Sequence, residues 1–184
     1  MEKRFTLKDG RSVSIKRMAA ADYQPKHKYD FVHEWLHQVS EYLLLDFNTD
    51  RIEDDRKWFL EKLSDSEHYI VLGALFKEKI VAQTSLELNP KFKKKVRHIG
   101  SWGIAINPKF QNQGLGERML LEIENIAREK GLEKLEVSYI ERNDAAEKLY
   151  LEKLYYMVEG RRKHGLKLHD GTYLDRILIG KILN

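Results

Sequence analysis

The fold is decided by the stretch Ile104-Ala105-Ile106-Asn107-Pro108-Lys109-Phe110-Gln111-Asn112-Gln113-Gly114-Leu115-Gly116. It reads as the end of an apolar strand, a turn with a proline, and a helix that opens on two glycines separated by one residue. The first N–H groups of a helix have no partner within the helix and lie at the positive end of its dipole. Glycines there let a phosphate approach the backbone without a Cβ in the way. The stretch therefore predicts that main-chain N–H groups of residues 111–117 hold a pyrophosphate.

Other phosphate-binding loops fit this stretch less well. A nucleotide P-loop needs Gly-Lys-Ser or Gly-Lys-Thr, which the chain lacks. The dinucleotide-binding pattern needs a third glycine, and Met119 occupies its position. The remaining alternative is that Gly114 and Gly116 only shape a tight turn from strand to helix.

A second pattern, Asn143, Ala146, Leu149 and Tyr150, follows on a predicted helix. Together with Pro108, Gln111, Gly114 and Gly116 of the first stretch, it resembles the acetyl-CoA motifs of the GNAT superfamily of N-acetyltransferases. The order of the predicted elements agrees with this superfamily over nearly the whole chain, so the resemblance implies one N-acetyltransferase domain over residues 1–184.

The resemblance implies an α/β (α+β) fold with a mixed, mostly antiparallel sheet of about seven strands and helices on both faces. Its central pair of strands, here residues 97–106 and 135–139, is expected to splay apart. The pantetheine arm of acetyl-CoA would lie between them and pair with the main chain of Ile104, Ala105 and Ile106. The other implied cofactor-binding residues are Gln111, Asn112, Gln113, Gly114, Leu115, Gly116 and Glu117 at the pyrophosphate, and Asn143 near the arm.

The implied reaction moves the acetyl group of acetyl-CoA directly onto a primary amine in a ternary complex. Tyr150 is implied to lie near the thioester sulfur, where a phenol can protonate the departing thiolate as a general acid. The general base stays open, because Ser101 stands where many relatives carry a glutamate. The candidates are His98, Glu87, Glu141 or a water chain. The acceptor, either a small molecule or a protein N-terminus, is expected over residues 29–63 and the hairpin of residues 161–173.

The remaining elements are predicted from local patterns. Apolar residues at helical spacing predict a helix over residues 29–45, and Asp50 with Glu53 predicts a capping box for a helix that ends near residue 63. A further helix is predicted over residues 143–154. Tyr155 stands where the family usually has glycine, so we expect this helix to end without a left-handed residue.

A zinc peptidase is the rival hypothesis, because His33-Glu34-Trp35-Leu36-His37 matches the pattern His-Glu-x-x-His. Two histidines one turn apart can bind zinc while the glutamate activates water. However, the chain does not continue with the Gly and the third His of metzincins. We expect His33 and His37 to lie on a solvent-facing polar stripe, and we expect no metal, although Glu53 or Glu61 stays open as a third ligand.

Composition excludes several other classes. The chain of 184 residues has no cysteine, so disulfides, thiolate metal sites and a cysteine nucleophile are absent. No signal peptide or membrane-spanning stretch is visible, which favours a cytoplasmic protein without a membrane partner. The formal net charge of +4 includes a basic run at residues 91–98, which leaves a CoA- or nucleic-acid-binding module as an alternative without catalysis. Nucleic acid is not the expected partner, and a homodimer is expected from the resemblance alone.

Overall fold

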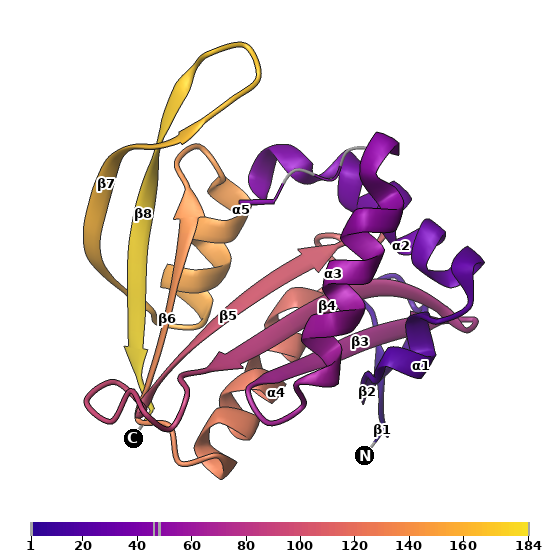
Figure 1. Ribbon diagram of the computed structural model, residues 1–184, viewed down its shortest axis with the longest axis horizontal. Helices are drawn as coiled ribbons and strands as arrows, with labels where there is room; N and C mark the ends of the chain where they lie inside the picture. The colour runs from indigo at the N-terminus through magenta and orange to yellow at the C-terminus, as the bar shows by residue number, and fades with distance from the viewer. Residues whose placement is uncertain (1, 46, 48, 184) are drawn as a thin grey trace.

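Eight strands form one mixed sheet in this computed structural model, which describes residues 2–45, 47 and 49–183. The order of the strands is β1-β2-β3-β4-β5-β6-β8-β7, and within the described residues only β5 and β6 pair in parallel (Figure 1). The predicted fold class is confirmed, with one strand more than the expected seven. The strands are β1 Glu2–Thr6, β2 Ser12–Arg17, β3 Tyr69–Phe76, β4 Lys79–Leu88, β5 Ile99–Ile106, β6 Lys134–Ile140, β7 Met157–Lys167 and β8 Tyr173–Ile182.

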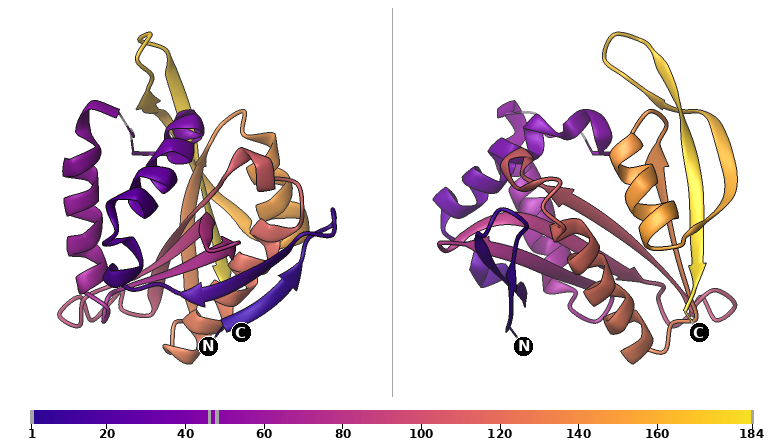
Figure 2. Two further views of the ribbon diagram at one scale, coloured as in Figure 1. Left: turned by 90° about the vertical axis from the view of Figure 1, so that its right-hand side faces the viewer. Right: turned by 180° about the vertical axis from the view of Figure 1, so that it is seen from behind.

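Helices cover both faces of the sheet (Figures 1 and 2). One face carries α1 Ala20–Tyr23, α2 Lys26–Gln38 and α3 Ile52–Ser64, and the other carries α4 Leu115–Glu129, α5 Asp144–Glu147 and the π-helical turn η4 Lys148–Lys153. Short 3-10 turns occur at η1 Ser40–Tyr42, η2 Thr49–Arg51 and η3 Pro108–Phe110. None of the helices in the described part of the chain is both long and apolar enough to cross a membrane.

Each face of the sheet has its own apolar core. On the α4 side, Met119, Ile123 and Ala127 recur at helical spacing and are completely buried, so this amphipathic helix packs flat on the strands. On the other side, α2 buries Trp35, and its indole Nε1 donates to the carbonyl of Ile80 in β4 at 3.1 Å. The two cores fix the two helical layers on opposite sides of the same strands.

The sheet divides between β5 and β6. Their parallel ladder contains only three residue pairs, from Ile99 with Lys134 to Ser101 with Glu136. Beyond Ser101, β5 stays paired with β4, whereas β6 follows β8. Figure 1 shows the two strands diverging from the lower edge of the sheet. The predicted splay of the central pair is therefore present, and it opens next to the end of β5.

One helix boundary and one capping box predicted from the sequence were wrong. The helix predicted over residues 29–45 ends at Gln38, because the Val39 N–H bonds to Leu36 at 3.1 Å and the chain turns through η1 into an extended residue, Leu43. The helix α3 begins after Arg51 without a side-chain cap. The capping box of Asp50 with Glu53 does not form, because Asp50 lies within the preceding turn η2.

The helix predicted over residues 143–154 is in fact a short α-helix followed by η4. Its end contradicts the expectation for Tyr155, which adopts φ 58° in the left-handed region. The Tyr156 N–H reaches back to the carbonyl of Tyr150 at 2.9 Å, and the Leu154 N–H bonds to Leu149 at 3.1 Å. These closing bonds impose the left-handed residue between them. The ring of Tyr155 is 76% exposed and so meets no neighbour that would prevent it.

Candidate active site

A cleft of about 1140 Å³ occupies the opening between β5 and β6 and continues under α2 and α3. All but two of the predicted site residues line it: Gln113 and Leu115 do not. The Leu115 side chain is completely buried in the core, so only its main-chain N–H at the start of α4 remains available to a ligand. The lining residues among those predicted are Ile104, Ala105, Ile106, Gln111, Asn112, Gly114, Gly116, Glu117, Asn143 and Tyr150.

The loop between β5 and α4 is held in shape by its own hydrogen bonds. The Gln111 Nε2 donates to the carbonyl of Ile106 at 3.0 Å, which ties the loop back to the end of β5. Asn112 and Gly114 adopt left-handed backbones with φ 60° and φ 81°. From the hairpin of β1 and β2, Arg11 donates to the carbonyl of Lys109 at 2.7 Å. The loop therefore presents the first turn of α4 to the cleft in a fixed orientation.

Glycine occurs at positions 114 and 116 for different structural reasons. Gly114 is the N-cap of α4 and requires glycine for its left-handed backbone, and it offers no side chain to cap the first N–H groups. A Cβ on Gly116 would lie 3.0 Å from Leu149 Cδ2 and 3.1 Å from Ile106 Cδ1. Gly116 therefore also serves the packing of α4 on its neighbours. The uncapped N–H groups fit an anion, and the packing keeps that turn close to the cleft.

Basic side chains gather around this anion-binding turn. Lys8 lies in the turn between β1 and β2, and its main-chain N–H donates to the Gln113 carbonyl at 3.4 Å. Lys153 lies 3.5 Å from Glu117 across the same end of the cleft. Sequence analysis missed these residues, because they come from separate segments and resemble ordinary surface lysines. The basic residues that line the cleft as a whole are Lys8, Lys62, Arg142, Lys148, Lys153 and Arg176.

Tyr150 lies in the wall of the cleft, where its ring contacts the rings of Trp102 and Tyr139. It is 8% exposed, and its ring packs edge-on against Trp102 with centroids 4.9 Å apart. Burial raises the pKa of the Tyr150 hydroxyl, which keeps it protonated. Among the described residues, the hydroxyl has no hydrogen-bond partner. Nearby, Asn143 caps α5 by accepting from the Ala146 N–H at 3.1 Å.

Three side chains, His98, Glu87 and Glu141, are candidates for the general base, and of these three only Glu87 lines the cleft. It lies on β4 directly opposite Ser101 of β5, the position where many relatives carry their acid. Lys62 of α3 lies 3.4 Å from the Glu87 carboxylate. His98 lies before β5 and does not reach the cleft.

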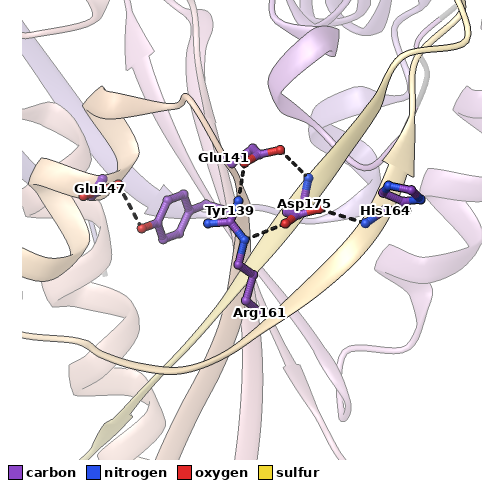
Figure 3. A network of polar contacts seen from close by, with 6 residues as sticks. All are labelled: Tyr139, Glu141, Glu147, Arg161, His164 and Asp175. Carbon is purple, nitrogen blue, oxygen red and sulfur yellow. Dashed lines mark hydrogen bonds and ion pairs between the residues drawn. The ribbon is translucent and has the colours of Figure 1, made fainter.

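Glu141 belongs to a polar network that fixes the hairpin of β7 and β8 (Figure 3). Its carboxylate accepts from Arg161 at 2.5 Å and from the Asp175 N–H at 2.8 Å. Arg161 also donates to Asp175 at 2.5 Å, and Asp175 accepts from the His164 N–H at 2.8 Å. The Arg161 guanidinium lowers the pKa of Asp175. Glu141 is therefore a structural residue that positions the hairpin beside the cleft.

The two histidines of the motif on α2 each have another partner within the described residues. His33 is 1% exposed, so the expectation that it faces solvent was wrong; its Nε2 donates to Asp55 at 3.2 Å. His37 is exposed, and its Nδ1 donates to the Phe47 carbonyl at 2.6 Å. The open candidate Glu53 pairs with Lys26. Within the part of the chain that the structure describes, no three His, Asp or Glu side chains gather as metal ligands.

The sequence profile of the Acetyltransferase (GNAT) family matches residues 29–155, which contain both motifs and most of the cleft. The chain belongs to this family. A search of curated proteins finds no significant match. The family's fold extends beyond the matched residues, since solved GNAT structures superpose on nearly the whole chain.

Three solved structures illustrate the likeness. The GNAT acetyltransferase of Streptococcus pneumoniae is 27% identical with a TM-score of 0.73, covering 92% of this chain and 99% of that one. The ribosomal-protein-S5-alanine acetyltransferase of Vibrio fischeri is 20% identical with a TM-score of 0.73, covering 99% and 97%. The structure of yncA from Salmonella typhimurium, solved with its cofactor acetyl-CoA, is 18% identical with a TM-score of 0.73, covering 94% of each chain.

Proposed function

We propose that this GNAT acetyltransferase is a single-domain enzyme that transfers the acetyl group of acetyl-CoA directly to a primary amine in a ternary complex. The observation that carries the proposal is the cleft between β5 and β6, which has an uncapped helix N-terminus at one end and Tyr150 in its wall. A thioester donor and an amine can meet there, one entering from each side of the sheet.

The cleft suits CoA at both ends. The edge of β5 from residue 104 to residue 106 has no β6 partner, so an extended pantetheine arm can pair with it as a strand would. The N–H groups of the first turn of α4 would hold the pyrophosphate, and Lys8, which also lines the cleft, would add positive charge there. Acetyl-CoA supplies an activated acetyl group; the residues of the chain hold and orient it.

The proton transfers are assigned to two side chains. The Tyr150 hydroxyl is free to donate a proton to the departing thiolate, and its raised pKa keeps that proton available. Glu87 lies on the acceptor side and can take a proton from the amine, directly or through water. In this proposal, main-chain N–H groups near Ile104 would stabilise negative charge on the carbonyl oxygen of the thioester.

Calorimetric titration of acetyl-CoA, with desulfo-CoA and ATP for comparison, tests the cofactor assignment. We expect micromolar affinity for acetyl-CoA and weaker binding of ATP. Lys8→Ala should weaken acetyl-CoA binding about five- to tenfold, because it removes a cation beside the phosphates. Lys3→Ala is the matched control, since Lys3 lies on the same hairpin but pairs with Glu122 outside the cleft. Failure of acetyl-CoA to bind would leave the two glycines as a structural turn only.

A further inference from the structure

Arg176 of β8 lines the cleft on the side opposite α2 and α3, and neighbouring residues hold its side chain in place. Its Nε and Nη2 donate to the Ser138 Oγ of β6 at 3.1 and 2.6 Å. The stem of Arg176 packs against Gly165 of β7, where a Cβ would lie 2.9 Å from Arg176 Cγ. The guanidinium is therefore oriented before any ligand arrives.

The charge of Arg176 has no counterpart in the described part of the chain. No described carboxylate pairs with it, whereas the neighbouring Arg161 pairs with both Glu141 and Asp175. Burial and the nearby charge of Arg162 both lower the pKa of Arg176. Burying a cation without an anion beside it costs free energy. The guanidinium of Arg176 is planar and has N–H groups that do not donate to Ser138, and these can donate to a carboxylate.

The opposite wall of the cleft is mostly apolar, and its described cation, Lys62, pairs with Glu87. This wall is built by the inner faces of α2 and α3 and by the segment that joins them, so it suits a hydrocarbon or aromatic group. Among the described residues of α2, α3, the segment between them and β4, Glu87 is the one carboxylate that lines the cleft. The apolar residues that contribute are Leu36, Val39, Leu43, Phe47, Trp58 and Phe59.

We propose that Arg176 binds a carboxylate of the acceptor, which makes the acceptor an amino-acid-like small molecule: an amine that carries both a carboxylate and an apolar side chain. The inference rests on the proposed function and narrows its acceptor class. The amine would approach the thioester between the splayed strands, the apolar group would lie against α2 and α3, and the carboxylate would meet the guanidinium.

Paired acceptors test this assignment. The full-length protein, saturated with acetyl-CoA, is assayed with L-phenylalanine, L-leucine and L-methionine, each against its own carboxamide. We expect kcat/KM for each acid to exceed that for its amide by roughly tenfold or more, because the amide cannot form a charged pair with a guanidinium. In Arg176→Gln this preference should fall to less than about threefold, while the rate with the amides stays within about twofold.

The controls separate recognition from folding. Arg162→Gln removes an exposed arginine that faces Arg176 across the hairpin but does not line the cleft, and it should retain the preference for acids. Thermal unfolding and acetyl-CoA affinity of both variants verify the fold. Equal use of acids and amides by the wild type, an unchanged preference in Arg176→Gln, or acetyl-CoA binding without acetylation of any acid would overturn the inference. Absence of acetyl-CoA binding would instead overturn the proposed function, and the inference with it.

Discussion

At the scale of single residues, Tyr150 combines burial with access to the cleft. Packing against Trp102 fixes its ring, while the hydroxyl has no hydrogen-bond partner among the described residues. The hydroxyl oxygen is not fully buried and opens into the cleft, where a ligand can reach it. This arrangement suits a group whose partner arrives with the substrate.

Tyr150→Phe should lower kcat by about 10- to 100-fold, because it removes a general acid and leaves its position occupied. The affinity for acetyl-CoA should stay the same, and the free energy of unfolding should change by less than about 0.5 kcal/mol, because the ring contacts remain. Steady-state kinetics, calorimetry and urea unfolding measure these three quantities.

The pH dependence of kcat provides the control for this variant. Burial raises the pKa of Tyr150, so the protonated acid form persists above the pKa of an ordinary tyrosine, near 10. The wild type should therefore show no loss of kcat from this group between pH 8 and about 10. An alkaline decline below pH 10 that disappears in Tyr150→Phe would contradict the raised pKa, and equal kcat in the two proteins would remove Tyr150 as the acid.

At the scale of elements, the turn η4 shows how the chain ends a helix without the expected glycine. Tyr155 is held left-handed by the bonds that close the turn. A residue with a Cβ is strained there by about 1 kcal/mol or more. The strain is tolerated because the same bonds place Tyr150 in the wall of the cleft and Tyr156 in the core.

Tyr155→Gly should raise the free energy of unfolding by about 0.5–1 kcal/mol, because relief of the left-handed strain exceeds the entropic cost of glycine. Urea unfolding measures the change. Tyr155→Ala is the matched control: it removes the exposed ring but keeps the Cβ, so it should give no gain. Equal stabilisation by both variants would assign the effect to the ring and not to the backbone.

Sequence patterns predicted those elements whose cause is local. The strand, proline turn and glycines around Gly114 were placed correctly, and so was the amphipathic face of α4. The end of α2 at Gln38 depends on a turn that local periodicity does not reveal. The burial of His33 depends on Asp55 of α3, a contact between separate segments. Lys8 and the Ser138–Arg176 pair were missed for the same reason.

At the scale of the whole molecule, the splay leaves two halves of the sheet joined by a short ladder. One half carries β1 to β5 and the other carries β6, β8 and β7, with three residue pairs between β5 and β6. A ligand that lies along β5 would link the halves where the ladder is missing. Binding should therefore stabilise the arrangement of the halves as well as the site itself.

Saturating acetyl-CoA should slow hydrogen exchange of the amides in residues 102–106 that point toward β6. Amides of residues 99–101, already paired with β6, should change less. At a ligand concentration 100 times Kd, the free energy of unfolding should also rise by about 2.7 kcal/mol. Exchange measured by mass spectrometry with and without acetyl-CoA tests this. Uniform protection across β5 would contradict a ligand that pairs only beyond Ser101.

The splay also bears on aggregation. Unpaired strand edges invite pairing with foreign chains, and the outer edges of this sheet carry charge that opposes it: β1 contains Lys3 and Arg4, and β7 contains Arg161 and Arg162. The inner edge of the sheet, at residues 104–106 of β5, is apolar and carries no charged residue that would oppose pairing. This edge lies inside the cleft, between helices and strands of the same molecule. It can therefore stay unpaired for a ligand, while strands of other proteins cannot reach it.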